Sequence, residues 1–94
     1  MHKLIGRFET PNASKYLQQL CKHFAHKIKV DHTAQEGICH FVMGPAYLSA
    51  DEVALTVRFE LSSPDHTDAA RGVIDSHLET FAFREGFKHM SWSS

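Results

Sequence analysis

A chain of 94 residues is long enough for one domain with its own core and too short for two. The formal net charge of -1 at pH 7, with Lys and Arg scattered along the chain, argues against binding to nucleic acid or to anionic lipid. A composition of 43% hydrophobic and 22% charged residues is that of a globular protein and not of a disordered chain. We therefore expect a single domain that spans residues 1–94.

Cysteine usage and the absence of targeting signals favour a cytoplasmic protein. Cys21 and Cys39 form no C-x-x-C motif, and we expect both to be reduced, partly buried thiols. No charged segment followed by an apolar one opens the chain, and no apolar run is long enough to span a membrane. The unusual feature is the count of eight histidines, because imidazoles change their charge near physiological pH.

A strand and an amphipathic helix are the first elements in chain order. Residues 2–9 alternate apolar with charged side chains, which is typical of a strand. Pro11 ends this strand, and Asn12 or Ser14 can cap the helix that follows. Over residues 13–27 the apolar side chains recur at helical spacing, so the helix has one face for the core.

The middle of the chain alternates in the manner of strands separated by short turns. A turn at residues 35–37 joins two strands into a hairpin, and Gly44-Pro45 is expected to break the chain again. The last of these strands has the clearest alternation, with Val, Leu and Phe on one face. The expected strands are residues 28–33, 38–43, 46–50 and 53–61.

A second helix and a final strand complete the chain. Ser63 is expected to cap this helix, with Pro64 at its first position. The helix runs to about Phe83, and Gly86 is placed to end it. Its solvated side is expected to include Asp75, and residues 87–92 can form the last strand.

The element order is therefore β-α-β-β-β-β-α-β. Consecutive strands with short turns predict an antiparallel meander, and two one-faced helices predict a layer on one face of that sheet. The sequence thus predicts an α+β two-layer sandwich. This order resembles the TATA-binding-protein-like (TBP-like) and helix-grip architectures, a likeness that carries no function with it.

Two histidines on the first helix are candidate metal ligands. His23 and His26 stand three residues apart, and two such imidazoles can chelate Zn²⁺, Ni²⁺ or Cu²⁺ when a third ligand converges. In the alternative interpretation both side chains complement the carbonyl end of the helix, as Lys22 and Lys27 also would. Cys21 lies about 160° around the helix from His23, which argues against a catalytic Cys–His pair.

His77 lies on the apolar face of the second helix, where a histidine is more often a neutral core residue with one satisfied N–H. Because both helices are expected to pack on the same sheet, His77 can approach His23 and form a pocket-facing cluster with it. Arg84 and Glu85 are expected to form a structural ion pair. Alternatively, Arg84 presents its guanidinium to a carboxylate or phosphate ligand.

Two segments of the chain resemble a bacterial family. They are YLQQLCKHFAHK at residues 16–27 and HLETFAFREG at residues 77–86. They are similar to the patterns Y-L-x-x-L-x-x-H-F-x-H-K and H-L-x-x-F-A-F-R-E of the domain of unknown function numbered 2218, and the likeness spans essentially the whole chain. That family has no established activity. The resemblance implies a small cytoplasmic bacterial protein whose relatives are in some cases encoded beside, or fused to, siderophore-interacting flavin reductases.

Three functions from different classes follow from these features. The first, which we favour, is a non-enzymatic binding or accessory module that the resemblance links to iron–siderophore metabolism, with a divalent metal or an iron complex as ligand and such a reductase as partner. Its site would include His23, His26, His77 and Arg84. The second is a small enzyme that uses His23 or His77 as general acid/base and Arg84 to hold an anion. The third is a structural module that homodimerises through an exposed sheet face or edge.

Overall fold

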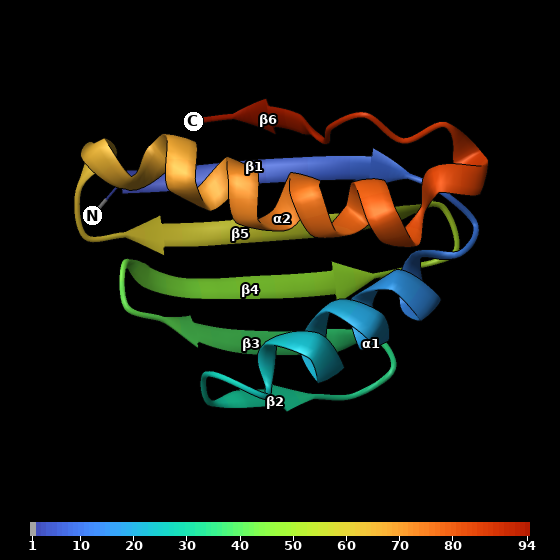
Figure 1. The fold of residues 1–94 in the computed structure, drawn as a ribbon, viewed down its shortest axis with the longest axis horizontal. Helices are drawn as coiled ribbons and strands as arrows, with labels where there is room; N and C mark the ends of the chain where they lie inside the picture. The colour runs from blue at the N-terminus through green and yellow to red at the C-terminus, as the bar shows by residue number, and fades with distance from the viewer. Residues whose placement is uncertain (1) are drawn as a thin grey trace.

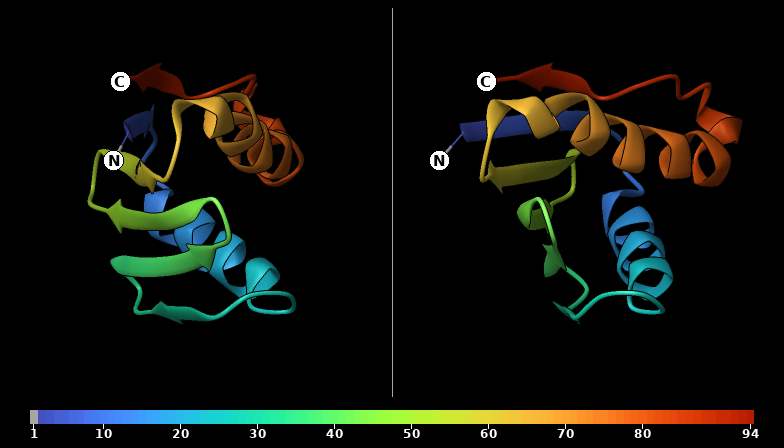
Figure 2. Two further views of the ribbon diagram at one scale, coloured as in Figure 1. Left: turned by 90° about the vertical axis from the view of Figure 1, so that its left-hand side faces the viewer. Right: turned by 60° about the vertical axis from the view of Figure 1, so that its left-hand side comes forward.

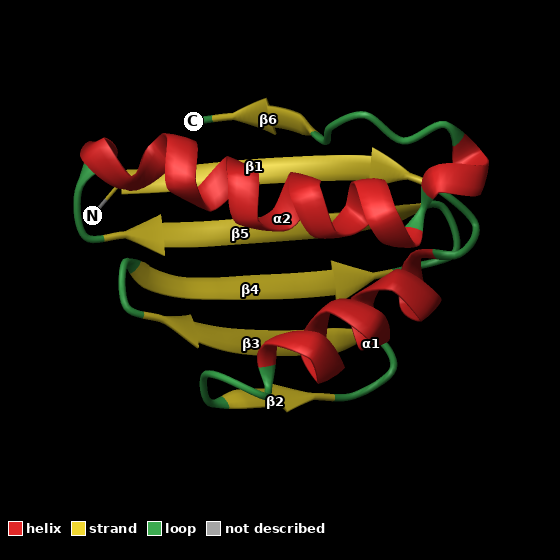
Figure 3. Ribbon diagram, viewed as in Figure 1, coloured by secondary structure: helices red, strands yellow, loops and turns green. Residues whose placement is uncertain are grey.

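The structure, a computed structural model, describes residues 2–94 and contains a six-stranded antiparallel sheet with two helices on one face (Figures 1 and 3). The strand order is β2-β3-β4-β5-β1-β6. This is the α+β two-layer sandwich that the sequence predicts. The strands are β1 (His2–Glu9), β2 (Val30–His32), β3 (Glu36–Phe41), β4 (Gly44–Ala50), β5 (Ala54–Leu61) and β6 (Ser91–Ser93). The helices are α1 (Ala13–Phe24) and α2 (Thr67–Phe81), with 3₁₀ turns at Pro64–His66 and Phe83–Glu85.

The core lies between the sheet and the helices because alternate residues of the central strands are apolar. Val57 and Phe59 of β5 are fully buried beneath Leu17 of α1 and Ile74 and Leu78 of α2. Burying each such side chain contributes roughly 1.5–3 kcal/mol to folding. Both helices lie on the same side of the sheet, and Figure 2 shows the other face uncovered.

Helix α1 ends at Phe24, three residues before the predicted end at Lys27. The backbone N–H of His26 bonds to the carbonyl of His23, which is the tighter i, i+3 pattern of a closing turn. This earlier end matters because it takes His26 off the helical face that carries His23.

The predicted caps of α1 are also wrong. Asn12 precedes the helix without a side-chain cap hydrogen bond. The Ser14 hydroxyl instead donates to the carbonyl of Ala34, at 2.6 Å, and so joins α1 to the loop before β3. Both side chains bind segments that are distant in the sequence. Local capping patterns do not predict such contacts.

The strand bounds differ from prediction mainly at the hairpins. β2 has only three residues, and β6 begins at Ser91 and not at Phe87. Gly44 and Pro45 do not break the chain but open β4, where Pro45 stands opposite His40. Gly44 has φ 135°, and a Cβ there would lie 2.1 Å from the carbonyl oxygen of Glu60. Only glycine fits that position.

Ser63 and Gly86 mark the two ends of the helical region as predicted, but each caps a 3₁₀ turn, and α2 itself is shorter than predicted, from Thr67 to Phe81. One of its surface residues is also not solvated. Ser63 Oγ accepts the N–H of Asp65, and Gly86 adopts φ 69° after the last turn. Asp75, predicted to be solvated, is half-buried. It accepts hydrogen bonds from the N–H of Met90 and from Trp92 Nε1, both at 2.9 Å. These bonds hold the segment that leads into β6.

The two cysteines and the lack of a long apolar run are the sequence features that favour a cytoplasmic protein. Cys21 and Cys39 are free and fully buried, and the hydrogen bond between their side chains, together with burial, raises the pKa of Cys39. The nucleophilicity of the Cys39 thiol is correspondingly low. Among residues 2–94, neither helix has the length and apolar character needed to cross a membrane. The compartment itself stays a prediction.

Two glycine substitutions test the backbone assignments. Gly44→Ala should destabilise the protein by about 2 kcal/mol or more, because the added methyl meets a carbonyl oxygen in a region of φ that only glycine readily adopts. Gly72→Ala is the matched control: it lies in α2 with nothing within 4 Å of the new methyl and should stabilise by about 0.5–1 kcal/mol. Urea unfolding of both variants measures these changes. Equal stabilities would contradict the assignment of Gly44.

Candidate functional site

Glu85 joins the two helices at one end of the sheet. Its carboxylate accepts hydrogen bonds from Thr10 Oγ1 at 2.8 Å, from Asn12 Nδ2 at 3.1 Å and from the Tyr16 hydroxyl. The end of α2 is thereby held against the start of α1. From this point the helices diverge across the sheet, as Figure 1 shows.

The hydrogen bonds to Glu85 change the pKa values of both partners. Partial burial raises the pKa of Glu85, but hydrogen bonds led by that from Tyr16, with the charge of Lys15, lower it below its ordinary value. Burial, then the hydrogen bond and the negative charge of Glu85, raise the pKa of Tyr16 to about 12. The pair is therefore a carboxylate bound by a neutral phenol at physiological pH.

Arg84 does not form the predicted ion pair with Glu85. The two charged pairs within ion-pair distance in residues 2–94 are His40–Asp31 and Arg58–Glu60. The Arg84 guanidinium lies 5.5 Å from the centroid of the exposed Phe83 ring. The prediction failed because Glu85 has three neutral donors from the start of α1, which local sequence spacing does not reveal. Arg84 as an anion-binding residue stays a prediction, and it lies outside the cleft described next.

Where the helices diverge they leave a cleft of about 240 Å³ over the β3–β4 hairpin. Its walls are mainly apolar, and the polar side chains come from both helices and the turn after α1. Phe24 and Phe41 stack edge to face in it, with ring centroids 5.1 Å apart. The lining residues are His23, Phe24, Lys27, Ile28, Phe41, Val73 and His77.

His23 and His77 meet across this cleft, which is the alternative that the sequence left open beside a core role for His77. Their ring centroids lie 4.5 Å apart, and His77 also contacts Phe24 at 5.0 Å. Nδ1 of His77 lies 2.6 Å from the carbonyl oxygen of Val73. Because a carbonyl only accepts, Nδ1 carries the hydrogen, and in the neutral ring Nε2 keeps a free lone pair.

The surroundings of His23 disfavour its protonated form. Desolvation, followed by the charges of His77, His26 and Lys27, lowers its pKa below 6.5. Lys27 therefore supplies the fixed positive charge of the rim, while the environment of His23 favours its neutral, hydrogen-bonding form. An apolar cleft with such a rim accommodates a molecule with an apolar body and an anionic head.

A second, shallower groove of about 360 Å³ continues the cleft outward. It shares Ile28 and Phe41 with the cleft and adds Val42, Met43 and His66. Val42 is fully exposed at the tip of the hairpin. His66, in the 3₁₀ turn before α2, is half-buried at this groove. No sequence signal pointed to it, because the groove is formed by segments far apart in the chain.

The metal-ligand hypothesis for His23 and His26 receives no support from geometry. His26 is exposed in the turn after α1 and does not line the cleft. Within residues 2–94, no group of three or more His, Cys, Asp or Glu side chains converges as a metal site requires. Since His23 and His77 supply at most two nitrogen ligands, metal binding stays a prediction that needs a ligand from outside.

The sheet, the two helices and the histidine-rimmed cleft define a small α+β protein of the two-layer class that carries a pocket between its helices. The family model described as "Uncharacterized protein conserved in bacteria (DUF2218)" matches residues 6–93, and the chain belongs to this family. The resemblance drawn from the two sequence segments is thus confirmed. The solved "NMR structure of PA4090 from Pseudomonas aeruginosa" is similar, with a TM-score of 0.80 and 25% identity over 99% of this chain and 96% of that chain. No curated protein gives a significant match.

The Glu85 contacts predict a pH-dependent contribution to stability. The folded-state pKa of Glu85 lies below its ordinary value of 4.5, so this contribution is present above pH 4.5 and is lost as the pH falls through the folded-state pKa. Glu85→Gln should lower stability at pH 7 by about 1 kcal/mol and remove this acid-dependent component. Unfolding in urea at pH 3 to 7 measures it. Glu79→Gln, at an exposed position of α2, is the control and should change neither the stability at pH 7 nor its dependence on pH. If both variants gave the same result, the stabilising role assigned to the Glu85 hydrogen bonds would be contradicted.

The His23–His77 contact predicts a second titration. In His77→Gln the pKa of His23 should rise toward 6.5, because one of the charges that lower it is gone. For the native protein, stability should decrease as the pH falls just below 6.5, since the unfolded chain there binds more protons at His23. NMR titration of the imidazole resonances measures the pKa. His89→Gln is the control, because His89 lies outside the cleft. If the pKa of His23 did not change in His77→Gln, the two rings would not interact.

Proposed function

We propose that this protein is a non-enzymatic binding module whose cleft between α1 and α2 holds a small molecule with an aromatic or apolar body and an anionic head. The observation that carries this proposal is the combination of an apolar cleft with His23, His77 and Lys27 at its rim. A binding site of this kind needs an enclosed apolar wall and a few polar groups that orient the ligand.

The apolar body would contact the aromatic wall. Phe24 lies between Phe41 and His77, with ring centroids at 5.1 and 5.0 Å and near-perpendicular planes. Phe24 itself is buried, whereas Phe41 and His77 are half-buried and keep ring surface that a planar group could contact. Ile28 and Val73 close the two sides.

The anionic head would bind at the rim. Lys27 is exposed, so its ammonium group pairs with an anion at a small desolvation cost. With Nδ1 of His77 bonded to the Val73 carbonyl, the Nε2 atom is left to face a ligand, and a bound anion would favour protonation of His23. Affinity for an acid should therefore increase as the pH falls toward 6.

Binding is favoured over catalysis by what surrounds the two imidazoles. A histidine that acts as general base is commonly oriented by a carboxylate. In residues 2–94 no carboxylate hydrogen-bonds to His23 or His77; the partner of His77 is the Val73 carbonyl. Arg84, the anion holder of the enzyme hypothesis, lies outside the cleft.

The link to iron–siderophore metabolism is the finer part of the proposal. It rests on the family resemblance, and the cleft is compatible with one arm of a catecholate complex, which is aromatic and anionic. A siderophore-interacting flavin reductase would be the partner that exchanges this ligand. Calorimetric titration of such a reductase into this protein tests the partnership separately from the ligand.

The binding test is an NMR titration with 2,3-dihydroxybenzoate, followed by its ferric complex and by Zn²⁺, Ni²⁺ and Fe²⁺ alone. We expect saturable shifts of His23, His77 and residues near Lys27, with Kd on the order of 10–100 μM for the free acid. Tighter binding of the ferric complex would support the iron assignment, whereas shifts with the free metals alone would support the metal hypothesis.

Lys27→Gln should weaken binding about tenfold, which corresponds to about 1.4 kcal/mol. Lys22→Gln is the matched control, because Lys22 is exposed on α1 and does not line the cleft. Equal weakening in both variants, or shifts confined to distant histidines such as His2, would refute the assignment of this cleft.

A further inference from the structure

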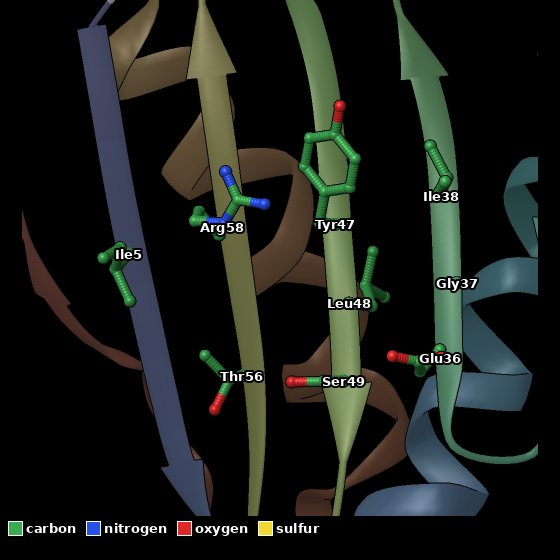
Figure 4. Close-up of a pocket in the computed structure, with 9 residues that line it drawn as sticks. All are labelled: Ile5, Glu36, Gly37, Ile38, Tyr47, Leu48, Ser49, Thr56 and Arg58. Carbon is green, nitrogen blue, oxygen red and sulfur yellow. The ribbon is translucent and has the colours of Figure 1, made fainter.

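The face of the sheet opposite the helices carries a hollow of about 380 Å³ over its central strands (Figure 4). Side chains alternate along a strand, so the residues between the buried ones point to this face. They include large apolar or aromatic groups that remain partly exposed, and Ile5 is 38% exposed. The residues that matter below are Ile5, Ile38, Tyr47, Ser49, Thr56 and Arg58.

The pairing register arranges these side chains in rows across the sheet. One row runs from β1 to β3 as Ile5, Arg58, Tyr47 and Ile38, since each of these residues is the direct partner of the next. It therefore has an isoleucine at each end and a cation beside an aromatic ring in the middle. The Arg58 guanidinium lies 4.4 Å from the centroid of the Tyr47 ring.

The neighbouring row, two residues along each strand, has opposite charges at its two ends. It runs as Arg7, Thr56, Ser49 and Glu36, again from β1 to β3. The two hydroxyl residues stand in its centre. In each row the two end residues are complementary. Both are apolar in the first row, and one is basic and the other acidic in the second.

We propose that this open face binds the same face of a second copy of the chain, around a two-fold axis that runs along the strands between β4 and β5. Rotation about this axis lays β1 on β3 of the partner subunit and β5 on β4, and each row lies opposite itself. The contact is isologous, as in most homodimers. Because both copies twist in the same sense, this rotation keeps the two twisted faces matched.

In the first row, this arrangement places Ile5 against Ile38 of the partner subunit. It also places Arg58 against Tyr47 of the partner subunit, repeating between copies the cation–π contact that already exists within each. Arg58 keeps its ion pair with Glu60, so no unpaired charge is buried at the centre. The hollow would be filled by the opposing side chains.

In the second row, Arg7 meets Glu36 of the partner subunit and Thr56 meets Ser49 of the partner subunit. Within one chain Arg7 and Glu36 cannot pair, because β5 and β4 separate their strands by roughly 14 Å. Among residues 2–94 no carboxylate lies within ion-pair distance of Arg7. Asp51, which feels the Arg7 charge, uses its carboxylate for two backbone N–H bonds at 2.8 Å.

The available area is sufficient for such a dimer. The four strands of this face contain six to eight residues each. At roughly 3.3 Å per residue and 4.8 Å per strand, they cover about 460 Å² per copy, or about 900 Å² in total. An area of this size is typical of weak, transient interfaces, so we expect a dimer with Kd in the micromolar range.

Sedimentation equilibrium at concentrations from 1 to 300 μM tests the proposal. The native protein should dimerise, and Arg7→Glu and Glu36→Arg should each weaken dimerisation about tenfold or more, because each places two like-charged pairs in the interface. The two variants mixed in equal amounts should associate with each other, since the mixed pair restores both opposite-charge contacts. The double variant should recover the native Kd. Arg71→Glu, exposed on α2, is the control and should dimerise as the native protein does.

Circular dichroism shows whether each variant is folded, and the mixing experiment needs only folded single variants. A monomeric native protein at 300 μM would overturn the proposal and leave this face to a different protein partner. A dimer that is insensitive to both charge reversals would overturn it as well, because the contact would then use another surface. This test does not involve the cleft on the helix side.

Discussion

The hydrogen bonds to Glu85 are the contact on which the arrangement of this protein depends. They join positions 75, 73 and 69 residues apart in the chain and hold the end of α2 against the start of α1. The sheet alone does not set the angle between two helices that pack on it, because ridges and grooves allow several crossing angles. With one end held, the helices separate toward the other, and the cleft lies in that space.

The cleft places polar groups where the core would otherwise be apolar. A histidine on the inner face of a helix is tolerated because the Val73 carbonyl accepts the hydrogen of His77 Nδ1, which avoids the cost of an unpaired buried donor. The other nitrogen is then free for a ligand. Lys27 contributes its charge to this rim because α1 ends at Phe24 and the chain turns there.

The two faces of the sheet serve separate purposes in the proposed assembly. The alternation of β-strands gives the helices one set of side chains and leaves the other set to a second copy. In a dimer built through the open face, the sheets lie at the centre and the two clefts face outward on opposite sides. Ligand binding and dimerisation then involve no common residue, since the cleft and the hollow are lined by different side chains.

The sequence by itself determined the architecture, because strand alternation, helical stripes and the Ser63-Pro64 and Gly86 signals depend on neighbouring residues only. It allowed His23 to approach His77, but the packing of the two helices decided that contact. The tertiary structure alone decided which partners the polar side chains take. Glu85 binds Tyr16 and not Arg84, Asp75 binds Trp92, and His26 is left outside the cleft. The physical reason is that these contacts join residues up to 75 positions apart, so packing and register choose them and local spacing does not.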